Sequence, residues 1–191
     1  DVVVAGIGVI PNAELARAAG LETGNGIAVD EYLRTSDPAI FAIGDCADHP
    51  NRFAANHFAG GRARLESVQN AVDQAKCVAK TIAGEPTPYR DAPWFWTDQF
   101  DVRFQMAGLG AGHDRRVVRG SIEAHKFSVF YFQEGRLLAV DSVNRFGDHV
   151  AARAKVVSIE QVTRIQTVAT QLEKWRDDLL QQRRQCVSHH V

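Results

Sequence analysis

The chain has 191 residues, of which 45% are hydrophobic and 8% aromatic, so it is long and apolar enough to form a globular core. Its formal net charge is -1, with 22 Lys and Arg against 23 Asp and Glu. This balance argues against general nucleic-acid binding, because phosphate recognition relies on an excess of basic residues. No apolar run approaches the ~18 residues of a membrane-spanning helix, so we expect no membrane segment.

The N-terminal residues predict a strand, a turn and a short helix. Residues 2–5 have the pattern of a buried strand, and Gly6-Ile7-Gly8 reads as a glycine-rich turn at its carboxyl end. Residues 14–19 predict a short helix, and Gly24-Asn25-Gly26 predicts a tight turn before a strand over 27–29. Because the chain begins in mid-strand and without methionine, we expect it to be a C-terminal fragment of a longer protein.

The most informative stretch is residues 35–47, where an apolar run that predicts a buried strand stops abruptly at Gly44-Asp45. A parallel sheet has this pattern where its carboxyl edge meets a polar ligand. Gly44 leaves room for close approach, and Asp45 offers acceptor oxygens to hydroxyl groups such as those of a ribityl chain. The alternative is an ordinary strand-to-turn junction, for which Gly-Asp is common.

Residues 62–83 predict the clearest helix, which would open near Leu65 and stop at Gly84. Its apolar positions fall on one face, which we expect to be buried: Leu65, Val68, Val72, Ala75, Val78 or Ala79, and Ile82. The following Gly84–Asp91 stretch, with two prolines, predicts a domain boundary.

From Trp94 onward the pattern changes to strands, with candidates over 104–109, 116–120, 126–132 and 137–143 and a hairpin turn at Glu134-Gly135. Trp94 and Trp96 are two residues apart, so in a strand both indoles would face one side and Phe95 the other. For either tryptophan, packing in the core is the alternative to a role in binding.

Residues 158–186 predict one long helix that starts with a capping box at Ser158 and Gln161. Its apolar residues step by three and four, which allows either packing on its own domain or self-association as a homo-oligomer. The fold class is therefore α/β plus α+β. We expect a parallel-sheet remnant over residues 1–85, a small mixed sheet-and-helix domain over 86–153 and a divergent helical tail over 154–191.

The three cysteines, Cys46, Cys77 and Cys186, are widely spaced and odd in number, which favours neither a disulfide framework nor a zinc site. We therefore expect no metal site and a reducing, cytoplasmic setting. Cys186 lies close to His189 and His190, but three such residues at a chain end are more typical of a tail than of a metal site.

Three segments together carry a family resemblance. Residues 35–45 resemble the second FAD-binding motif of flavoprotein reductases with two dinucleotide-binding domains. With residues 64–75 and 93–99 they look like the FAD-dependent NAD(P)H:ferredoxin reductases of bacterial oxygenase systems. The resemblance runs from residue 1 to about residue 153.

The resemblance implies an oxidoreductase that binds FAD, uses NAD(P)H and passes electrons to a ferredoxin-type iron–sulfur protein. It implies that Asp45, beside Gly44, binds the ribityl chain. It also implies that the backbone amide of Val68, at the positive end of its helix, faces the flavin ring, and that Trp96 lies beside this ring. Gly6-Ile7-Gly8 would lie near the nicotinamide dinucleotide.

Two other functions remain open. One is a non-catalytic interaction or dimerisation module similar to apoptosis-inducing factor. The other is a different member of the pyridine nucleotide-disulfide oxidoreductase superfamily. A disulfide reductase is disfavoured, because the C-terminal His-Pro…Glu motif of those enzymes does not occur in this sequence. The sequence does not distinguish NAD from NADP, and we expect the chain alone to be inactive.

Overall fold

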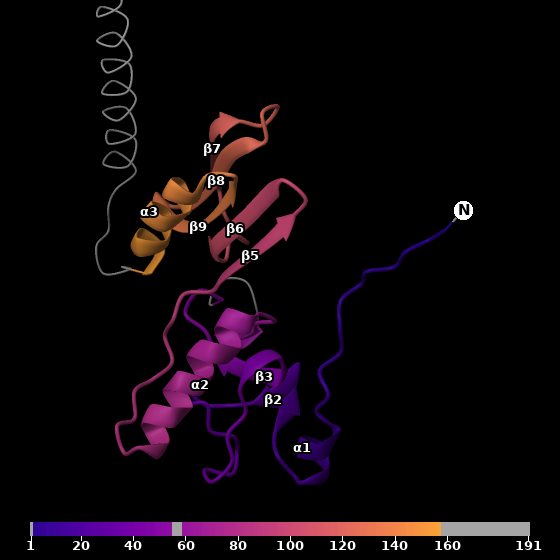
Figure 1. Cartoon of the computed structure of the whole chain (residues 1–191). Helices are drawn as coiled ribbons and strands as arrows, with labels where there is room; N and C mark the ends of the chain where they lie inside the picture. Colours follow the sequence, from indigo (N-terminus) through magenta and orange to yellow (C-terminus); the bar gives the residue numbers. More distant parts are fainter. Residues whose placement is uncertain (1, 55–58, 158–191) are drawn as a thin grey trace, which may run out of the picture.

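The computed structural model describes residues 2–54 and 59–157. Figure 1 shows two parts, one containing α1, α2 and a small sheet, and the other containing a larger sheet and α3. We call residues 13–84 the turn-and-helix part and residues 94–157 the sheet part. A connecting segment joins α2 to β5, the first strand of the sheet part.

The turn-and-helix part has a four-stranded sheet in the order β1-β2-β3-β4, in which β2 and β3 are parallel and the other neighbours antiparallel. Its first elements are α1 (Glu14–Ala18), β1 (Thr23–Gly24), β2 (Gly26–Ala28), β3 (Ala47–Pro50) and β4 (Arg62–Arg64). The short helix and the tight turn between Gly24 and Gly26 confirm the sequence prediction.

Two of the strands predicted before Gly44 were wrong, one in the N-terminal segment and one in this part. Residues 2–5 form no strand and the side chains of Val2, Val3 and Val4 are exposed. Between residues 39 and 43 there is only an isolated bridge, from Phe41 to Arg34. A strand forms by pairing with a neighbour, and no other strand of the described residues pairs with either segment. An apolar run was therefore not enough to produce a strand.

The principal helix, α2 (Val68–Ile82), begins later than predicted. Residues 62–64, which we predicted to be helical, form β4 instead. Ser67 caps the helix, since its hydroxyl oxygen accepts a hydrogen bond from the Asn70 amide at 3.1 Å. The predicted end is confirmed, because Gly84 follows with a φ of +86°.

Most of the predicted buried face of α2 was also wrong, although Val78 is buried as predicted. Val68 is 70% exposed and Val72 and Ile82 are exposed as well. The buried residues of the helix are Asn70, Gln74, Cys77 and Val78. The two amide side chains are buried because hydrogen bonds satisfy them, from Tyr89 to Asn70 and from Gly44 to Gln74. Periodicity alone did not reveal that the inner face is half polar.

The sheet part has a five-stranded antiparallel sheet in the order β5-β6-β9-β8-β7. Its strands are β5 (Trp94–Gln99), β6 (Val102–Gly108), β7 (Arg115–Ser121), β8 (Lys126–Gln133) and β9 (Arg136–Val143). All of the predicted strands are present. The predicted hairpin turn is confirmed too, with positive φ at Glu134 and Gly135, as tight hairpins require.

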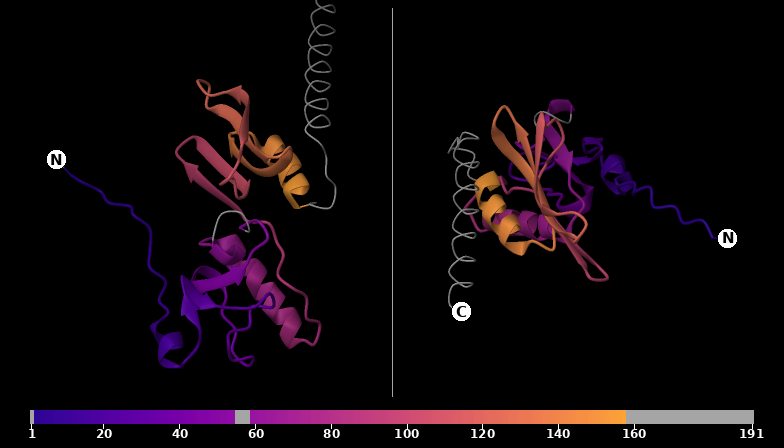
Figure 2. Two further views of the ribbon diagram at one scale, coloured as in Figure 1. Left: turned by 180° about the vertical axis from the view of Figure 1, so that it is seen from behind. Right: turned by 90° about the horizontal axis from the view of Figure 1, so that it is seen from above.

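One face of this sheet packs against α3 (Phe146–Val157), a helix that the sequence reading missed (Figures 1 and 2). Their shared core contains Ala107, Phe130, Phe132, Val140 and Ala152. The predicted boundary between residues 153 and 154 falls inside α3, and the predicted helix over 158–186 lies outside the described residues. The mixed and antiparallel sheets agree with the predicted fold class.

Among the helices of the described residues, none combines the length and the apolar character needed to cross a membrane.

Candidate functional site

The Gly44-Asp45-Cys46 segment is a tight 3-10 turn that leads directly into β3. Gly44 has a φ of +75°, a conformation that side chains rarely adopt. A Cβ atom at this position would lie 3.4 Å from the Cβ of Ala71 on α2. The glycine therefore allows both the turn and its close packing against the helix.

Hydrogen bonds hold this turn on two sides. On one side, the Gly44 amide donates to Oε1 of Gln74 on α2, at 2.6 Å. On the other side, Nη1 of Arg64 on β4 donates to the Asp45 carbonyl at 2.9 Å and also to the carboxylate of Glu66. Since both neighbouring elements fix its backbone, the turn has a defined orientation.

The side chain of Asp45 is available to bind a ligand. Asp45 is exposed, and within the described residues its carboxylate makes no hydrogen bond or ion pair. The backbone of the turn is fixed while the carboxylate oxygens stay available as acceptors. This arrangement suits a ligand with hydroxyl groups.

The first two turns of α2 lie beside this 3-10 turn, because Gly44 packs against Ala71 and bonds to Gln74. The Asn70 amide donates to the Ser67 hydroxyl, whereas the amide of Val68 makes no hydrogen bond within the described residues. Amides at a helix start, with the positive end of the helix dipole, favour an electron-rich or anionic group.

Trp96 lies in the other part of the molecule, on β5. Its ring stacks on that of Trp94 with centroids 5.5 Å apart and planes 23° apart, which confirms that both indoles face one side of the strand. The guanidinium of Arg153 lies 3.9 Å from the centre of the Trp94 ring. The indole pair is thus supported by a cation–π contact from α3.

Both tryptophans line a groove of about 580 Å³ between the β5–β6 hairpin and α3. In this groove Nε1 of Trp94 and Nδ1 of His149 are buried and have no hydrogen-bond partner in the described part of the chain. Burial lowers the pKa of His149, and the nearby Arg153 lowers it further. Both effects favour the neutral imidazole, and the sequence offered no signal for this residue.

The structure brings together three of the predicted site residues, Gly44, Asp45 and Val68. It does not bring Gly6-Ile7-Gly8 to them, because that segment is exposed and runs away from the rest of the chain (Figure 2). The sequence reading missed two residues that hold the turn, Gln74 and Arg64. Both lie in the 64–75 segment that carries the family resemblance, but neither was singled out there.

The residues present fit a flavin dinucleotide. The exposed Asp45 carboxylate matches the hydroxyl groups of a ribityl chain, and the free amide of Val68 matches an electron-rich ring edge. Gly44 itself is buried against Ala71 of α2, so it shapes the turn from the inner side. No Cys, His or carboxylate group of the described residues forms a cluster that could hold a metal ion.

Two protein-family models match the chain. Residues 1–75 match the pyridine nucleotide-disulphide oxidoreductase model, and residues 94–173 match the reductase C-terminal model. The first match contains the Gly44-Asp45 turn and the start of α2, and the second begins at Trp94. The first model therefore covers Gly44, Asp45 and Val68, and the second covers Trp96.

Similar curated proteins are reductases of redox partners. The chain is 56% identical over 160 residues to rhodocoxin reductase of Rhodococcus erythropolis, covering 84% of the chain and 36% of that protein. It is 50% identical over 145 residues to putidaredoxin reductase of Pseudomonas putida, covering 76% of the chain and 33% of that protein. The chain thus spans little more than a third of the length of these relatives.

Solved structures agree. The ferredoxin reductase from Rhodopseudomonas palustris has a TM-score of 0.76 at 48% identity, covering 84% of this chain and 38% of that one. The covalent putidaredoxin reductase–putidaredoxin complex has a TM-score of 0.75 at 45% identity, covering 82% of this chain and 36% of that one. By these matches, residues 1–75 belong to the pyridine nucleotide-disulphide oxidoreductases and residues 94–173 to the reductase C-terminal family, and the chain is similar to the corresponding part of ferredoxin reductases.

Proposed function

We propose that this chain is part of an FAD-dependent oxidoreductase that transfers electrons from NAD(P)H to a ferredoxin-type iron–sulfur protein of an oxygenase system. The observation that carries the proposal is the Gly44-Asp45 turn. Its backbone is fixed by Gln74 and Arg64, while its carboxylate is exposed beside the start of α2. The identity to rhodocoxin reductase and other ferredoxin reductases supports it.

In this proposal each residue has one task. The Asp45 carboxylate accepts hydrogen bonds from the hydroxyls of the ribityl chain, and the Val68 amide donates toward the pyrimidine edge of the ring. Trp96 shields the ring from water. FAD, when bound, supplies the chemistry that links a two-electron donor such as NAD(P)H to a one-electron acceptor. Gly6-Ile7-Gly8 is proposed to lie near the nicotinamide.

The partner and the setting are also proposals. The similarity to the reductase in the putidaredoxin complex supports an iron–sulfur protein as the electron acceptor. Cys46 and Cys77 are free, in keeping with a reducing, cytoplasmic setting. We further propose that the domain boundary lies in the Gly84–Asp91 segment, between α2 and β5.

The test uses the whole protein that contains this chain. We expect it to purify with the absorbance spectrum of bound FAD, to be reduced by NADH or NADPH under anaerobic conditions and then to reduce a ferredoxin. Asp45→Ala should weaken FAD binding about tenfold or more, as expected for the loss of charged hydrogen bonds. Glu85→Ala, which removes an exposed carboxylate after α2, is the matched control. A protein that neither binds FAD nor oxidises a nicotinamide would rule out the proposal.

A further inference from the structure

A chain of buried polar side chains runs from the Gly44-Asp45 turn into the interior. Gln74 is fully buried, and its Oε1 accepts the Gly44 amide at 2.6 Å. Its Nε2 lies 3.3 Å from Nδ1 of His49, which is 1% exposed. On the far side, Nε2 of the same ring lies 3.2 Å from Nδ2 of Asn51. The function proposed above uses Gln74 only as a contact of the turn and assigns no role to His49 or Asn51.

The order of the hydrogen bonds fixes the orientation of the Gln74 amide. Because Oε1 receives the Gly44 amide, the NH₂ group of Gln74 must point toward His49. A neutral imidazole can accept from such a donor, whereas an imidazolium has no acceptor. The ring of Tyr89 packs edge-on against His49 with centroids 5.3 Å apart, which limits its rotation. His49 is therefore fixed behind the glutamine.

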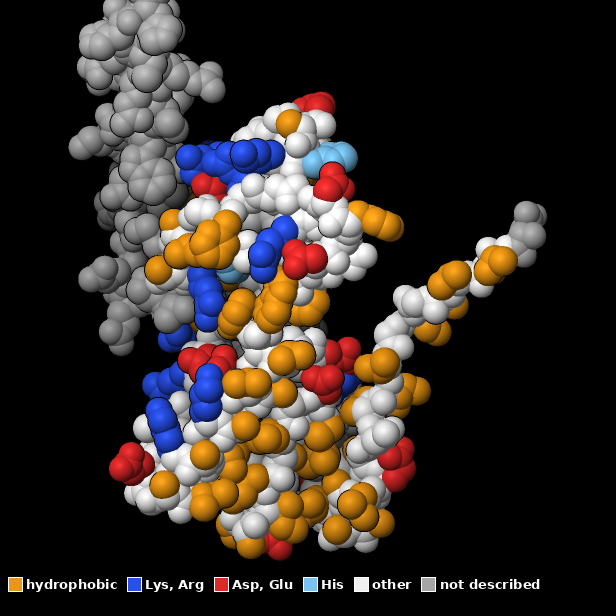
Figure 3. Space-filling model, in the orientation of Figure 1, with side chains coloured by type: hydrophobic (Ala, Val, Ile, Leu, Met, Phe, Trp, Pro, Cys, Tyr) orange, Lys and Arg blue, Asp and Glu red, His pale blue; other side chains and the backbone are white. Residues whose placement is uncertain are grey.

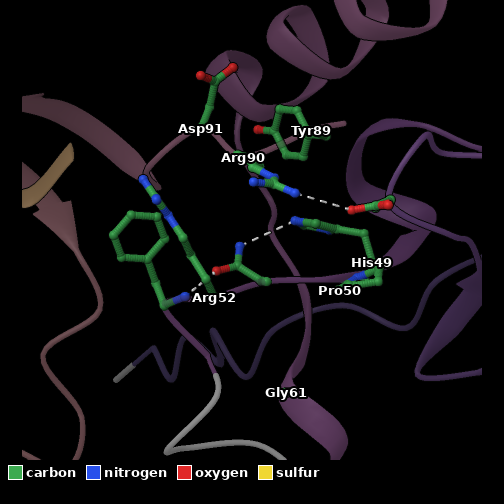
Figure 4. A pocket seen from close by; sticks show the side chains of 10 residues that line it. His49, Pro50, Arg52, Gly61, Tyr89, Arg90 and Asp91 are labelled. Atoms are coloured by element: carbon green, nitrogen blue, oxygen red, sulfur yellow. Dashed lines mark hydrogen bonds and ion pairs between the residues drawn. The ribbon is translucent and has the colours of Figure 1, made fainter. Parts of the chain in front are cut away.

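The far end of this chain of side chains reaches solvent. His49 and Asn51 line a cavity of about 400 Å³ together with Tyr89, Arg90 and Asp91 (Figure 4). In the cavity Asn51 Oδ1 accepts the Phe53 amide at 2.9 Å, so the NH₂ group of Asn51 also faces the imidazole. A neutral imidazole has one acceptor nitrogen, so His49 accepts from Gln74 or from Asn51 but not from both. The buried side chains thus connect a fixed loop on one side with the turn on the other.

We propose that Gln74, supported by His49, is a positioning residue that holds the Gly44-Asp45 turn in the shape that binds the flavin cofactor. This inference rests on the proposed function, because the turn is assigned to FAD there. The contact is specific: Gly44 is buried although Asp45 is exposed, and its amide donates to Gln74 Oε1. Without this acceptor the amide would be buried unpaired, and the turn would have to open to reach water.

Gln74 acts on the cofactor only through the turn. Its side chain is fully buried and its polar atoms face Gly44 and His49. Its amide therefore contacts no ligand at the surface. On the other side of the turn, Arg64 binds the Asp45 carbonyl from a partly exposed position. Loss of Gln74 leaves that second contact in place, so the turn should become mobile while the fold is kept.

The test compares two substitutions at one position in the whole protein. Gln74→Met keeps the length of the side chain but removes the acceptor, and we expect the dissociation constant of FAD to rise about tenfold or more. Gln74→Glu keeps an acceptor for the Gly44 amide and should restore binding to within about threefold of the wild type. Lys80→Ala, an exposed change on the same helix, is the control and should leave FAD binding unchanged.

Hydrogen exchange provides a readout that does not depend on the cofactor. In the FAD-free protein the Gly44 amide should be protected, and Gln74→Met should remove this protection while the amides of β8 keep theirs. Rapid exchange of Gly44 in the wild-type protein would overturn the proposal even if Gln74→Met failed to fold. Equal FAD binding by Gln74→Met and the wild type would overturn it as well.

The two proposals fail in different ways. If the wild-type protein binds no FAD, the proposed function is wrong, but exchange at Gly44 still tests the hydrogen bond from the turn to Gln74. If the wild type binds FAD and Gln74→Glu loses as much affinity as Gln74→Met, the proposed function stands and the positioning role does not.

Discussion

The two parts of the molecule bury different kinds of side chain. In the sheet part, burial along β8 alternates, and Phe130 and Phe132 pack into the core under α3. In the turn-and-helix part, α2 turns Asn70 and Gln74 inward and leaves Val68 exposed. Figure 3 shows hydrophobic side chains gathered on the surface of this second part. In the sheet part, the side chains that the alternating pattern predicts to be buried are buried. The inner face of α2 is instead half polar, and Gln74 on it bonds to the Gly44-Asp45 turn.

The largest expected effect tests whether the sheet part depends on its apolar core. Phe130→Ala removes a buried ring from β8 and should lower the free energy of unfolding by about 3–5 kcal/mol. Phe100→Ala, at the exposed tip of the β5–β6 hairpin, should change it by less than about 0.5 kcal/mol. Urea denaturation followed by circular dichroism measures both. Similar losses of unfolding free energy in the two variants would show that the apolar core does not dominate the stability of the sheet part.

A smaller effect is expected from the one polar cluster that the sheet part does bury. The Asp148 carboxylate accepts hydrogen bonds from Nε of Arg145 at 2.6 Å and from the Ser128 hydroxyl at 3.2 Å. It also accepts one from the guanidinium of Arg119. Asp148→Asn removes the carboxylate charge that Arg145 and Arg119 bind and should cost about 3 kcal/mol of unfolding free energy.

Asp101→Asn, an exposed change in the β5–β6 turn, is the control for this prediction. Chemical denaturation of both variants at neutral pH is the measurement. If Asp148→Asn were as stable as Asp101→Asn, the cluster would have no net role in stability.

The turn-and-helix part can be disturbed at a glycine next to the turn. A Cβ at Gly26, where φ is +126°, would lie 2.5 Å from the Cys46 carbonyl oxygen, so Gly26→Ala must displace the Gly44-Cys46 turn from β2. We expect a loss of about 2 kcal/mol in unfolding free energy from the strained backbone alone, together with weaker FAD binding.

Gly24→Ala tests the same hairpin without the clash, because no atom lies within 4 Å of the added Cβ. Its melting temperature and FAD affinity should stay close to those of the wild type. Thermal melts and flavin titrations of both variants in the whole protein decide the matter. Equal behaviour of the pair would mean that contact with Cys46 does not position the turn.

The smallest expected effect is a pH dependence with one contribution from each part. Burial lowers the pKa of both His49 and His149; Arg62 and Arg153 add to the effect, and for His49 the backbone of Ala47 and the charge of Asp48 oppose it. The unfolded chain then binds protons more readily than the folded one. Stability is therefore complete above the ordinary histidine pKa of about 6.5 and falls as the pH drops below it.

Two single variants assign these contributions. His49→Gln and His149→Gln should each reduce the loss of unfolding free energy between neutral and mildly acidic pH. Replacement of the exposed His125 by Asn should leave that loss unchanged. Denaturation series at several pH values provide the measurement, and a loss that persists in full in both variants would contradict the prediction.

Prediction from sequence succeeded where pairing is local. The hairpins of the sheet part lie between strands that are neighbours along the chain, so alternation and the Glu134-Gly135 turn were enough to place them. The α3 helix was missed, because no element was predicted between the strand that ends at Val143 and the helix that begins at Ser158. Its Asp148 is buried by ion pairs that no pattern of apolar residues reveals.

In the turn-and-helix part the same rules failed for physical reasons. The segment before Gly44 has a strand-like sequence but pairs only through Phe41. Asp45 and the amide of Val68 were named as candidates from motifs in the local sequence, and their role in binding stays a prediction. Gln74 and His49 could not, because their roles arise from hydrogen bonds between residues 25 and 30 positions apart.

The stacked indoles of β5 also give the protein a built-in optical signal. Two indole rings 5.5 Å apart and nearly parallel couple their electronic transitions. The sheet part should therefore show a split aromatic band in its circular dichroism spectrum, which disappears when Trp94 and Trp96 separate. Because this signal originates on the strand that joins the two parts, it would report on β5 without any added label.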